Sequence, residues 1–91
     1  MGFKHSTAPW RIDEVVQCSI HSGDKFIALI HDSGSFSRGE HKANAHLIAA
    51  APELLQVLQL IVSYHDDGNR SLHREDLEMA RKAIAKALGQ Q

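Results

Sequence analysis

Hydrophobic and polar positions alternate in the first part of the chain, where β-branched residues accumulate from Trp10 to Ile20. Successive side chains of a strand point to opposite sides, so Val16, Cys18 and Ile20 would share one face. The next segment, His21-Ser22-Gly23-Asp24, is rich in residues typical of tight turns. We therefore predict a half-buried strand that ends in a hairpin turn.

A second strand is predicted from Lys25 to His31, antiparallel to the first. Its apolar residues are Phe26, Ala28 and Ile30 on one face and Ile27 and Leu29 on the other. A strand that is apolar on both faces is normally covered on both sides. We expect helices on one face, and we leave open a partner or a second subunit on the other.

The period of the apolar positions becomes helical after the loop from Asp32 to Phe36. Ser37 and Glu40 fit a capping box, so a helix is expected to begin around Arg38. Its apolar stripe comprises Leu47, Ile48, Ala51, Leu54, Leu55, Leu58, Ile61 and Val62. Because proline lacks the N–H donor, we assign Pro52 the structural role of restarting the helix, with little change of face.

A third helix is predicted after the turn at Asp66 to Asn69, with Ser71 or His73 as its cap and Gly89 as its stop. Its expected core face is Leu77, Ala80, Ile84 and Leu88. Strands followed by helices indicate an α+β fold, with an N-terminal antiparallel β-hairpin of two or three strands packed against two or three C-terminal helices.

The N-terminal residues show no periodicity, so we assign residues 1–9 to a flexible leader and residues 10–91 to a single α+β domain. Trp10 is expected to be structural, because it can order the leader by docking. Asn44 shares the apolar face of the first helix, where an unpaired amide would cost roughly 1–3 kcal/mol. We therefore predict a structural hydrogen bond from Asn44 to loop or strand backbone, near Trp10 or the loop from Asp32 to Phe36.

Composition places the chain among folded globular proteins, with 43% hydrophobic and 23% charged residues. The formal net charge of −1 creates no global field that would attract nucleic acid or an anionic membrane. Cys18 is a single cysteine, and no apolar run resembles a signal peptide or a membrane span. We expect a protein of the host bacterial cytoplasm, without membrane insertion.

Two stretches carry a family resemblance: His5-Ser6-Thr7-Ala8-Pro9-Trp10, and Ala43-Asn44-Ala45-His46-Leu47-Ile48-Ala49-Ala50-Ala51-Pro52-Glu53-Leu54-Leu55. They resemble a family of short bacteriophage and prophage accessory proteins. Its members begin with a His-Thr-Pro-Gly-Pro-Trp-like segment and share an Ala-Asn-Ala-Arg-Leu-Ile-Ala-Ala-Ala-Pro-Glu-Leu-Leu signature, in which His46 here replaces the arginine. The resemblance implies a phage origin, and with it a gene neighbourhood where inhibitors of host defence are common.

The histidines do not form a recognisable metal motif. His41 and His46 are five residues apart and point about 140° from each other on a helix, whereas helical metal ligands normally lie four apart. Cys18 lies on the apolar face of its strand, where a thiol is usually inert. Ser33 and Ser35 lack a nucleophile-elbow context. We predict no catalytic residue, no cofactor and no metal, and hence no enzyme.

These observations favour a non-enzymatic phage accessory protein that binds a host protein, with an anti-CRISPR or other anti-defence inhibitor as the narrowest version. The candidate protein-binding residues are Arg38, His41, Lys42, Arg70 and Arg74. A homodimer is left open. The alternative is a small DNA-associated or transcription-regulatory phage protein, although we do not expect nucleic acid as a partner. Its phosphate contacts would be basic residues of the last helix, namely Arg74, Arg81, Lys82 and Lys86.

Overall fold

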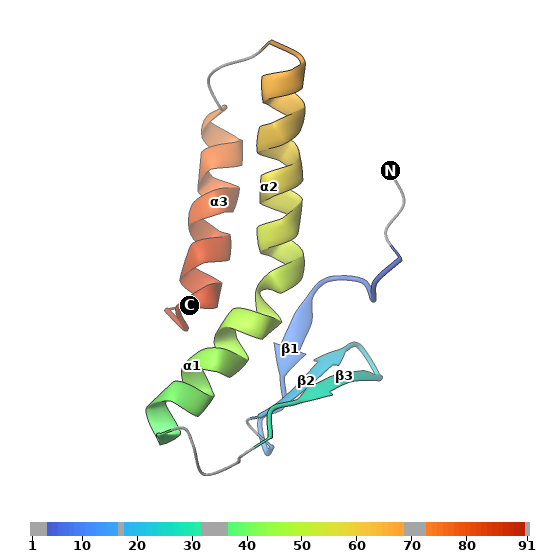
Figure 1. Ribbon diagram of the computed structural model, residues 1–91, viewed down its shortest axis with the longest axis vertical. Coiled ribbons are helices and arrows are strands. Elements are labelled where there is room, and N and C mark those ends of the chain that lie inside the picture. The colour runs from blue at the N-terminus through green and yellow to red at the C-terminus, as the bar shows by residue number, and fades with distance from the viewer. Residues whose placement is uncertain (1–3, 17, 32–36, 69–72, 91) are drawn as a thin grey trace.

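The computed structural model describes residues 4–16, 18–31, 37–68 and 73–90, and within these it contains a small sheet followed by helices (Figure 1). The strands are β1 (Trp10–Ile12), β2 (Ser19–Ser22) and β3 (Lys25–Leu29), and the helices are α1 (Arg38–Ala49), α2 (Ala51–Asp66) and α3 (Arg74–Ala87). The sheet is antiparallel in the order β1-β2-β3. The predicted α+β fold is confirmed.

The predicted long first strand is wrong, because Asp13 ends it. The Asp13 Oδ1 atom accepts hydrogen bonds from the backbone N–H groups of Val15 and Val16, at 2.8 and 2.9 Å. This side chain thereby offers the backbone a turn in place of a sheet ladder. The chain reverses, and the two halves of the expected strand become β1 and β2, in which Ile12 pairs with Ile20.

The predicted hairpin turn is confirmed between β2 and β3. Ser22 pairs with Lys25, which leaves Gly23 and Asp24 as a two-residue turn. Gly23 has φ +58°, a conformation that a short hairpin turn requires and that glycine adopts without steric cost.

The core lies where α1 covers one face of the sheet. Ser37 caps α1 as predicted, since its Oγ accepts from the backbone N–H of Glu40. Ile20 of β2 is fully buried. The other buried hydrophobic residues are Ala45, Ala49, Ala50, Val57 and Ala83. Because most of these side chains are a single methyl group, backbones approach closely and the core is thin.

The restart at Pro52 is also confirmed. Pro52 is buried in the first turn of α2, and the axes of α1 and α2 bend by 49° at this junction. Within the described residues, no single helix is long and apolar enough to cross a membrane, although α1 and α2 would together meet that criterion by length and composition.

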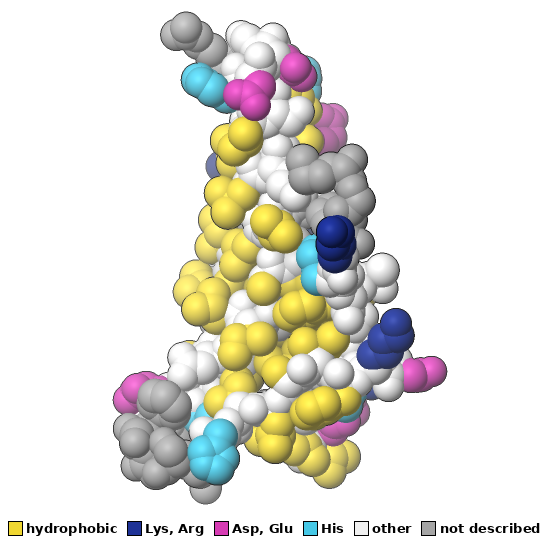
Figure 2. All heavy atoms as spheres, turned by 45° about the vertical axis from the view of Figure 1, so that its right-hand side comes forward, with side chains coloured by type: hydrophobic (Ala, Val, Ile, Leu, Met, Phe, Trp, Pro, Cys, Tyr) yellow, Lys and Arg dark blue, Asp and Glu magenta, His cyan; other side chains and the backbone are white. Residues whose placement is uncertain are grey.

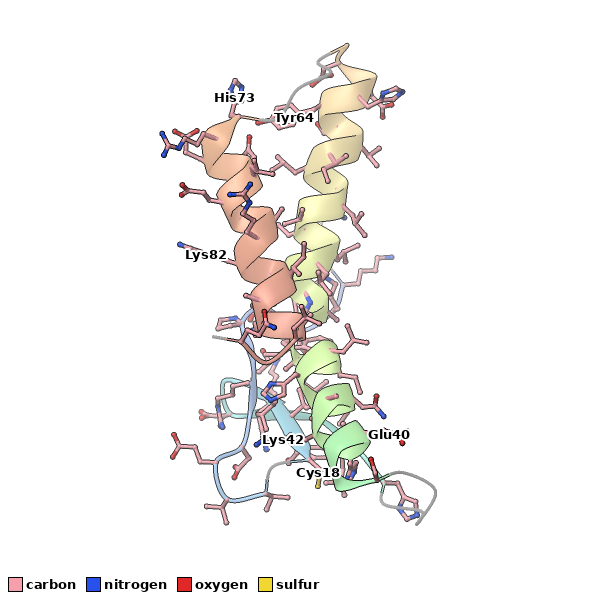
Figure 3. All side chains as sticks on the ribbon, turned by 90° about the vertical axis from the view of Figure 1, so that its left-hand side faces the viewer. Cys18, Glu40, Lys42, Tyr64, His73 and Lys82 are labelled. Atoms are coloured by element: carbon pink, nitrogen blue, oxygen red, sulfur yellow. The ribbon has the colours of Figure 1, made fainter. Side chains whose placement is uncertain are left out.

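Helices α2 and α3 form an antiparallel hairpin that projects beyond the sheet, in a molecule of 47 × 25 × 21 Å (Figure 1). At the far end of the hairpin the Tyr64 hydroxyl donates to Asp76 Oδ2 at 2.6 Å, and the His73 ring lies edge-on to Tyr64 (Figure 3). The Asp76 carboxylate raises the pKa of Tyr64, because it accepts a hydrogen bond from the neutral phenol. His73 is the N-cap residue of α3, but its side chain makes no capping hydrogen bond.

The predicted core face of α3 is wrong in most of its residues. Ala83 is the buried residue of this helix, whereas Leu77, Ile84 and Leu88 are exposed. Among the described elements, α3 packs mainly against α2 and α1, and these two helices cover the side of α3 that carries Ala83. The widest apolar stripe of the helix therefore remains on the surface.

Candidate protein-binding surfaces

The outer face of the sheet presents large apolar side chains to solvent. Residues that pair across two strands lie on the same face, so the pair Ile20 and Ala28 faces inward toward α1. His21 pairs with Phe26 on the opposite face, and Leu29, which pairs with Ser19, lies on that face as well. The predicted grouping of Phe26 with Ala28 is wrong, because a bulge between the Ile20 and His21 pairs breaks the alternation of β3. We call the surface formed by Arg11, His21, Phe26 and Leu29 the outer sheet face.

Exposure on the outer sheet face is high for residues of this size. Phe26 is 60% exposed and Leu29 is 56% exposed. The Phe26 ring packs edge-on against His21, with the ring centres 5.7 Å apart, so the aromatic side chain is held in place while much of it still contacts solvent. No described helix covers this face. The face that the sequence left without an assigned cover is therefore open.

A Ser-His-Asp cluster borders the same face without the geometry of a catalytic triad. His21 Nε2 is 2.7 Å from Ser19 Oγ and 3.9 Å from Asp13 Oδ2. In a triad the carboxylate holds the other ring nitrogen, which fixes the tautomer that takes the serine proton. Here one nitrogen faces both groups, and Ser19 is buried. The cluster connects the turn after β1 to the sheet.

Asp13 is stabilised as a carboxylate by this turn. The backbone N–H groups of Val16 and Val15 hold the pKa of Asp13 below its ordinary value, and His21 and Arg11 add smaller effects of the same sign.

The predicted binding residues do not form one patch. His41 is half-buried, and its Nε2 lies 3.0 Å from the carbonyl oxygen of Ile30, which connects α1 to the end of β3. Lys42 is exposed on α1, near the sheet, whereas Arg74 follows His73 at the opposite end of the long axis (Figure 3). Arg74 also lies 3.8 Å from Glu78 on its own helix. Arg38 begins α1, with its side chain outside the description, and Arg70 lies outside the described residues.

Trp10 contacts the segment that precedes it in the chain. Its Nε1 donates to the carbonyl of Ser6 at 3.2 Å, and the Ser22 hydroxyl donates to the carbonyl of Thr7 at 2.6 Å. Residues 6 and 7 are thereby joined to the sheet. Asn44 is half-buried in α1, and within the described chain its side chain has no hydrogen bond. The predicted bond from Asn44 to strand backbone or near Trp10 is therefore absent from the described residues. The other predicted site, the loop from Asp32 to Phe36, lies outside them.

One polar junction was not predicted from the sequence. Lys86 Nζ of α3 is 2.7 Å from Glu53 Oε1 of α2 and donates to the carbonyl of Trp10 at 2.9 Å. Both ionic side chains are largely buried. Their positions in the sequence, 33 residues apart, give no signal of this contact, because it depends on how the helices pack.

Metal ligation finds no support in the part of the chain that the structure describes. No group of three or more His, Cys, Asp or Glu side chains there could hold a metal ion. Cys18 is a free, half-buried thiol beside the turn that precedes β2.

Comparison with known proteins gives a family. No curated protein and no solved structure matches the chain. A family model described as Salmonella phage P22 protein Y8K6 matches residues 1–91, in agreement with the phage resemblance of the sequence. Because this match spans the 91 residues, the chain belongs to the Salmonella phage P22 protein Y8K6 family and is a phage accessory protein.

Proposed function

We propose that this phage accessory protein acts without catalysis, by binding a host protein through the outer sheet face. The observation that carries the proposal is the exposure of Phe26 and Leu29 on a sheet face that no described helix covers. A few anchor residues supply most of the binding energy in protein interfaces, and aromatic side chains such as phenylalanine are enriched in the interface core. A phage protein that covers a surface of a host defence complex, such as a CRISPR effector, would be the narrowest version of this function.

The position of β3 supports the same reading. It is an edge strand, paired within the described sheet to β2 alone. Edge strands offer unpaired backbone groups to an incoming strand, and neighbouring side chains give such a contact specificity. A partner strand added to β3 would lie beside Phe26 and Leu29. Burial of these two side chains would then add to the backbone hydrogen bonds.

The DNA-associated alternative has weaker support. The acids Glu75 and Asp76 begin α3, and Arg74 lies near Glu78, so the basic residues of this helix do not form an uninterrupted phosphate-binding face.

The proposal is tested by capture from host lysate after nuclease treatment, with the tagged full chain and with its Phe26→Glu variant. Leu47→Glu is the matched control: Leu47 is 54% exposed, and it lies about 160° around α1 from the buried Ala45 and Ala49 that contact the core. We expect one host protein, in stoichiometric amount, with wild type and Leu47→Glu, and its loss with Phe26→Glu.

Two outcomes would overturn the proposal. Equal capture by wild type and Phe26→Glu would exclude the outer sheet face as the contact. Capture that depends on nucleic acid would support the DNA-associated alternative, and a gel shift at low salt that weakens steeply with added salt would establish it.

A further inference from the structure

Helix α2 carries an exposed apolar row beside the side that packs on α3. Val57 is buried and Tyr64 bonds to Asp76, so these residues mark the α3-facing side. At about 100° per residue, Leu58 lies about 100° and Val62 about 140° around the helix from Val57. Leu58 is 60% exposed, and Val62 is exposed to a similar degree.

Helix α3 has a matching row. Ala83 is buried. Measured from it in the same rotational sense, Ile84 lies about 100°, Leu77 about 120° and Leu88 about 140° around the helix. All three are exposed, and Ile84 is 52% exposed.

The two rows lie on the same side of the hairpin. Two antiparallel helices are related by a two-fold axis perpendicular to the plane that contains both helix axes. This rotation exchanges the helices but does not exchange the two sides of that plane. Residues at the same angle from the packed side, measured in the same sense around each helix, therefore lie on the same side of the pair. We call the resulting surface the hairpin face, formed by Leu58, Ile61, Val62, Leu77, Ile84 and Leu88. Figure 2 shows hydrophobic side chains gathered in a broad band along the helical part of the molecule.

The α2 part of this face carries no charge. No Lys, Arg, Asp or Glu occurs between Glu53 and Asp66, and Glu53 is paired with Lys86. On α3, Arg81 lies between Leu77 and Ile84 along the row. The methylene groups of its side chain can cover apolar surface while the guanidinium reaches solvent at the edge of the hairpin face. Two copies can thus meet along α2 without like-charge repulsion.

The chain exposes more surface than a compact monomer of its mass. The accessible surface is 6914 Å², whereas a folded monomer of 10.1 kDa is expected to expose about 5,300 Å². The radius of gyration is 15.1 Å, against about 12 Å for a compact domain of this length. The excess area, roughly 1,600 Å², exceeds the roughly 800 Å² that each partner contributes to a standard interface.

We propose that a second copy of the chain covers the hairpin face, so that two α2–α3 hairpins form an antiparallel four-helix bundle. The rows have the three- and four-residue spacing of helix-packing seams, as in Leu58, Ile61 and Val62. A two-fold dimer, the commonest symmetric assembly, buries the same patch on both subunits and needs no other partner. The outer sheet face lies at the other end of the molecule and remains available for the proposed host contact (Figure 1).

The test is the solution mass of the full chain, measured by light scattering and sedimentation across a wide concentration range. Wild type is expected at twice the 10.1 kDa chain mass. The double variant Leu58→Glu/Ile84→Glu places four acids in the interface, so its dissociation constant should rise about 100-fold or more. The control Val15→Glu, at a side chain 90% exposed in the turn after β1, should remain dimeric.

A monomeric wild type at every concentration would overturn the proposal, and so would a double variant that stays dimeric. Circular dichroism verifies that each variant is folded. If the acidic variant does not fold, Leu58→Gln/Ile84→Gln replaces it, with the same expected shift toward monomer. Because Phe26→Glu leaves the hairpin face intact, loss of host capture with a normal dimer mass separates the two proposals.

Discussion

Lys86 connects three parts of the fold through a single ammonium group. It bonds to Glu53 of α2 and to the carbonyl of Trp10 at the start of β1, and so joins the helical hairpin to the sheet. Within the described residues Glu53 Oε2 is buried without a hydrogen-bond partner, so this carboxylate depends on the charge of Lys86 for compensation. Removal of either side chain would leave the other as an uncompensated charge where the hairpin meets the sheet.

Asp13 makes the stability of the turn after β1 depend on pH. Its pKa is lower in the folded chain than the ordinary value of an aspartate, chiefly through hydrogen bonds from the backbone N–H groups of Val16 and Val15. The folded state therefore binds this proton less readily than the unfolded state. The stabilisation from the Asp13 carboxylate is present above the pKa of the unfolded chain, at about pH 4, and is lost as the pH falls through the lower pKa of the folded chain. We expect Asp13→Asn, which keeps an acceptor oxygen but does not titrate, to flatten the acid side of the melting temperature profile.

The Asp13→Ala variant separates the hydrogen bonds from the charge. It removes the acceptor at every pH, so its melting temperature should already be lower at neutral pH, where Asp13→Asn stays close to wild type. Melting curves recorded from pH 2 to 7 provide the comparison. Identical acid profiles for wild type and Asp13→Asn would show that this carboxylate contributes nothing to the pH dependence.

Helix α3 ends in a motif that depends on Gly89. The N–H of Gln90 bonds to the carbonyl of Ala85, and the N–H of Gly89 bonds to that of Lys86, the pattern of a Schellman cap. Gly89 has φ +70°, and a Cβ at this position would lie 2.8 Å from Cδ2 of His46. Gly89→Ala should therefore lower the free energy of unfolding by about 1–2 kcal/mol, measured by urea denaturation.

Gly39 is the matched control for this substitution. It lies in the first turn of α1, where φ is not positive, and among the described residues a Cβ would meet only Ser37 Oγ, at 3.9 Å. Gly39→Ala should leave stability unchanged or raise it by about 0.5–1 kcal/mol, because alanine is the better helix former. Equal effects of the two substitutions would contradict the role assigned to the cap.

The elements that local chemistry determines were predictable from the sequence, and those that depend on tertiary packing were not. Three helix ends depend on a few neighbouring residues and are confirmed: the start of α1 at the Ser37 cap, the start of α2 at Pro52, and the end of α3 at Gly89. The turn at Asp13 is an exception, because aspartate side chains commonly accept a hydrogen bond from the backbone two residues further on, and yet the sequence pattern predicted a strand there. Periodicity identified the apolar stripe of α3 but not what covers it.

The candidate binding surfaces were likewise predictable where they depend on local sequence and not where they depend on tertiary packing. The sequence showed that β3 is apolar on both faces, and from this we left a partner open for one of them; the structure identifies the open face as that of Phe26 and Leu29. Charged residues such as Lys42 and Arg74 gave no guide, because their separation across the molecule depends on the lengths and directions of the helices.

At the scale of the whole molecule, the thin core and the projecting hairpin link folding to assembly. Among the described residues, Ile20 is the only large side chain that is fully buried, and most of the other buried hydrophobic residues are alanines. Much of the apolar surface that could stabilise the chain lies instead on the hairpin face. If a second copy covers that face, the association contributes directly to the stability of the fold, as in dimers whose subunits are marginal alone.

This link predicts a melting temperature that rises with protein concentration. Dissociation accompanies unfolding of a dimer, so mass action favours the folded state at higher concentration, whereas a monomer melts at one temperature at every concentration. Calorimetry over a dilution series should show the rise for wild type and for Val15→Glu, which leaves the hairpin face intact. The Leu58→Glu/Ile84→Glu variant should melt at a lower temperature that does not change on dilution. A wild-type melting temperature that is constant over the series would mean that the hairpin face does not support the fold through self-association.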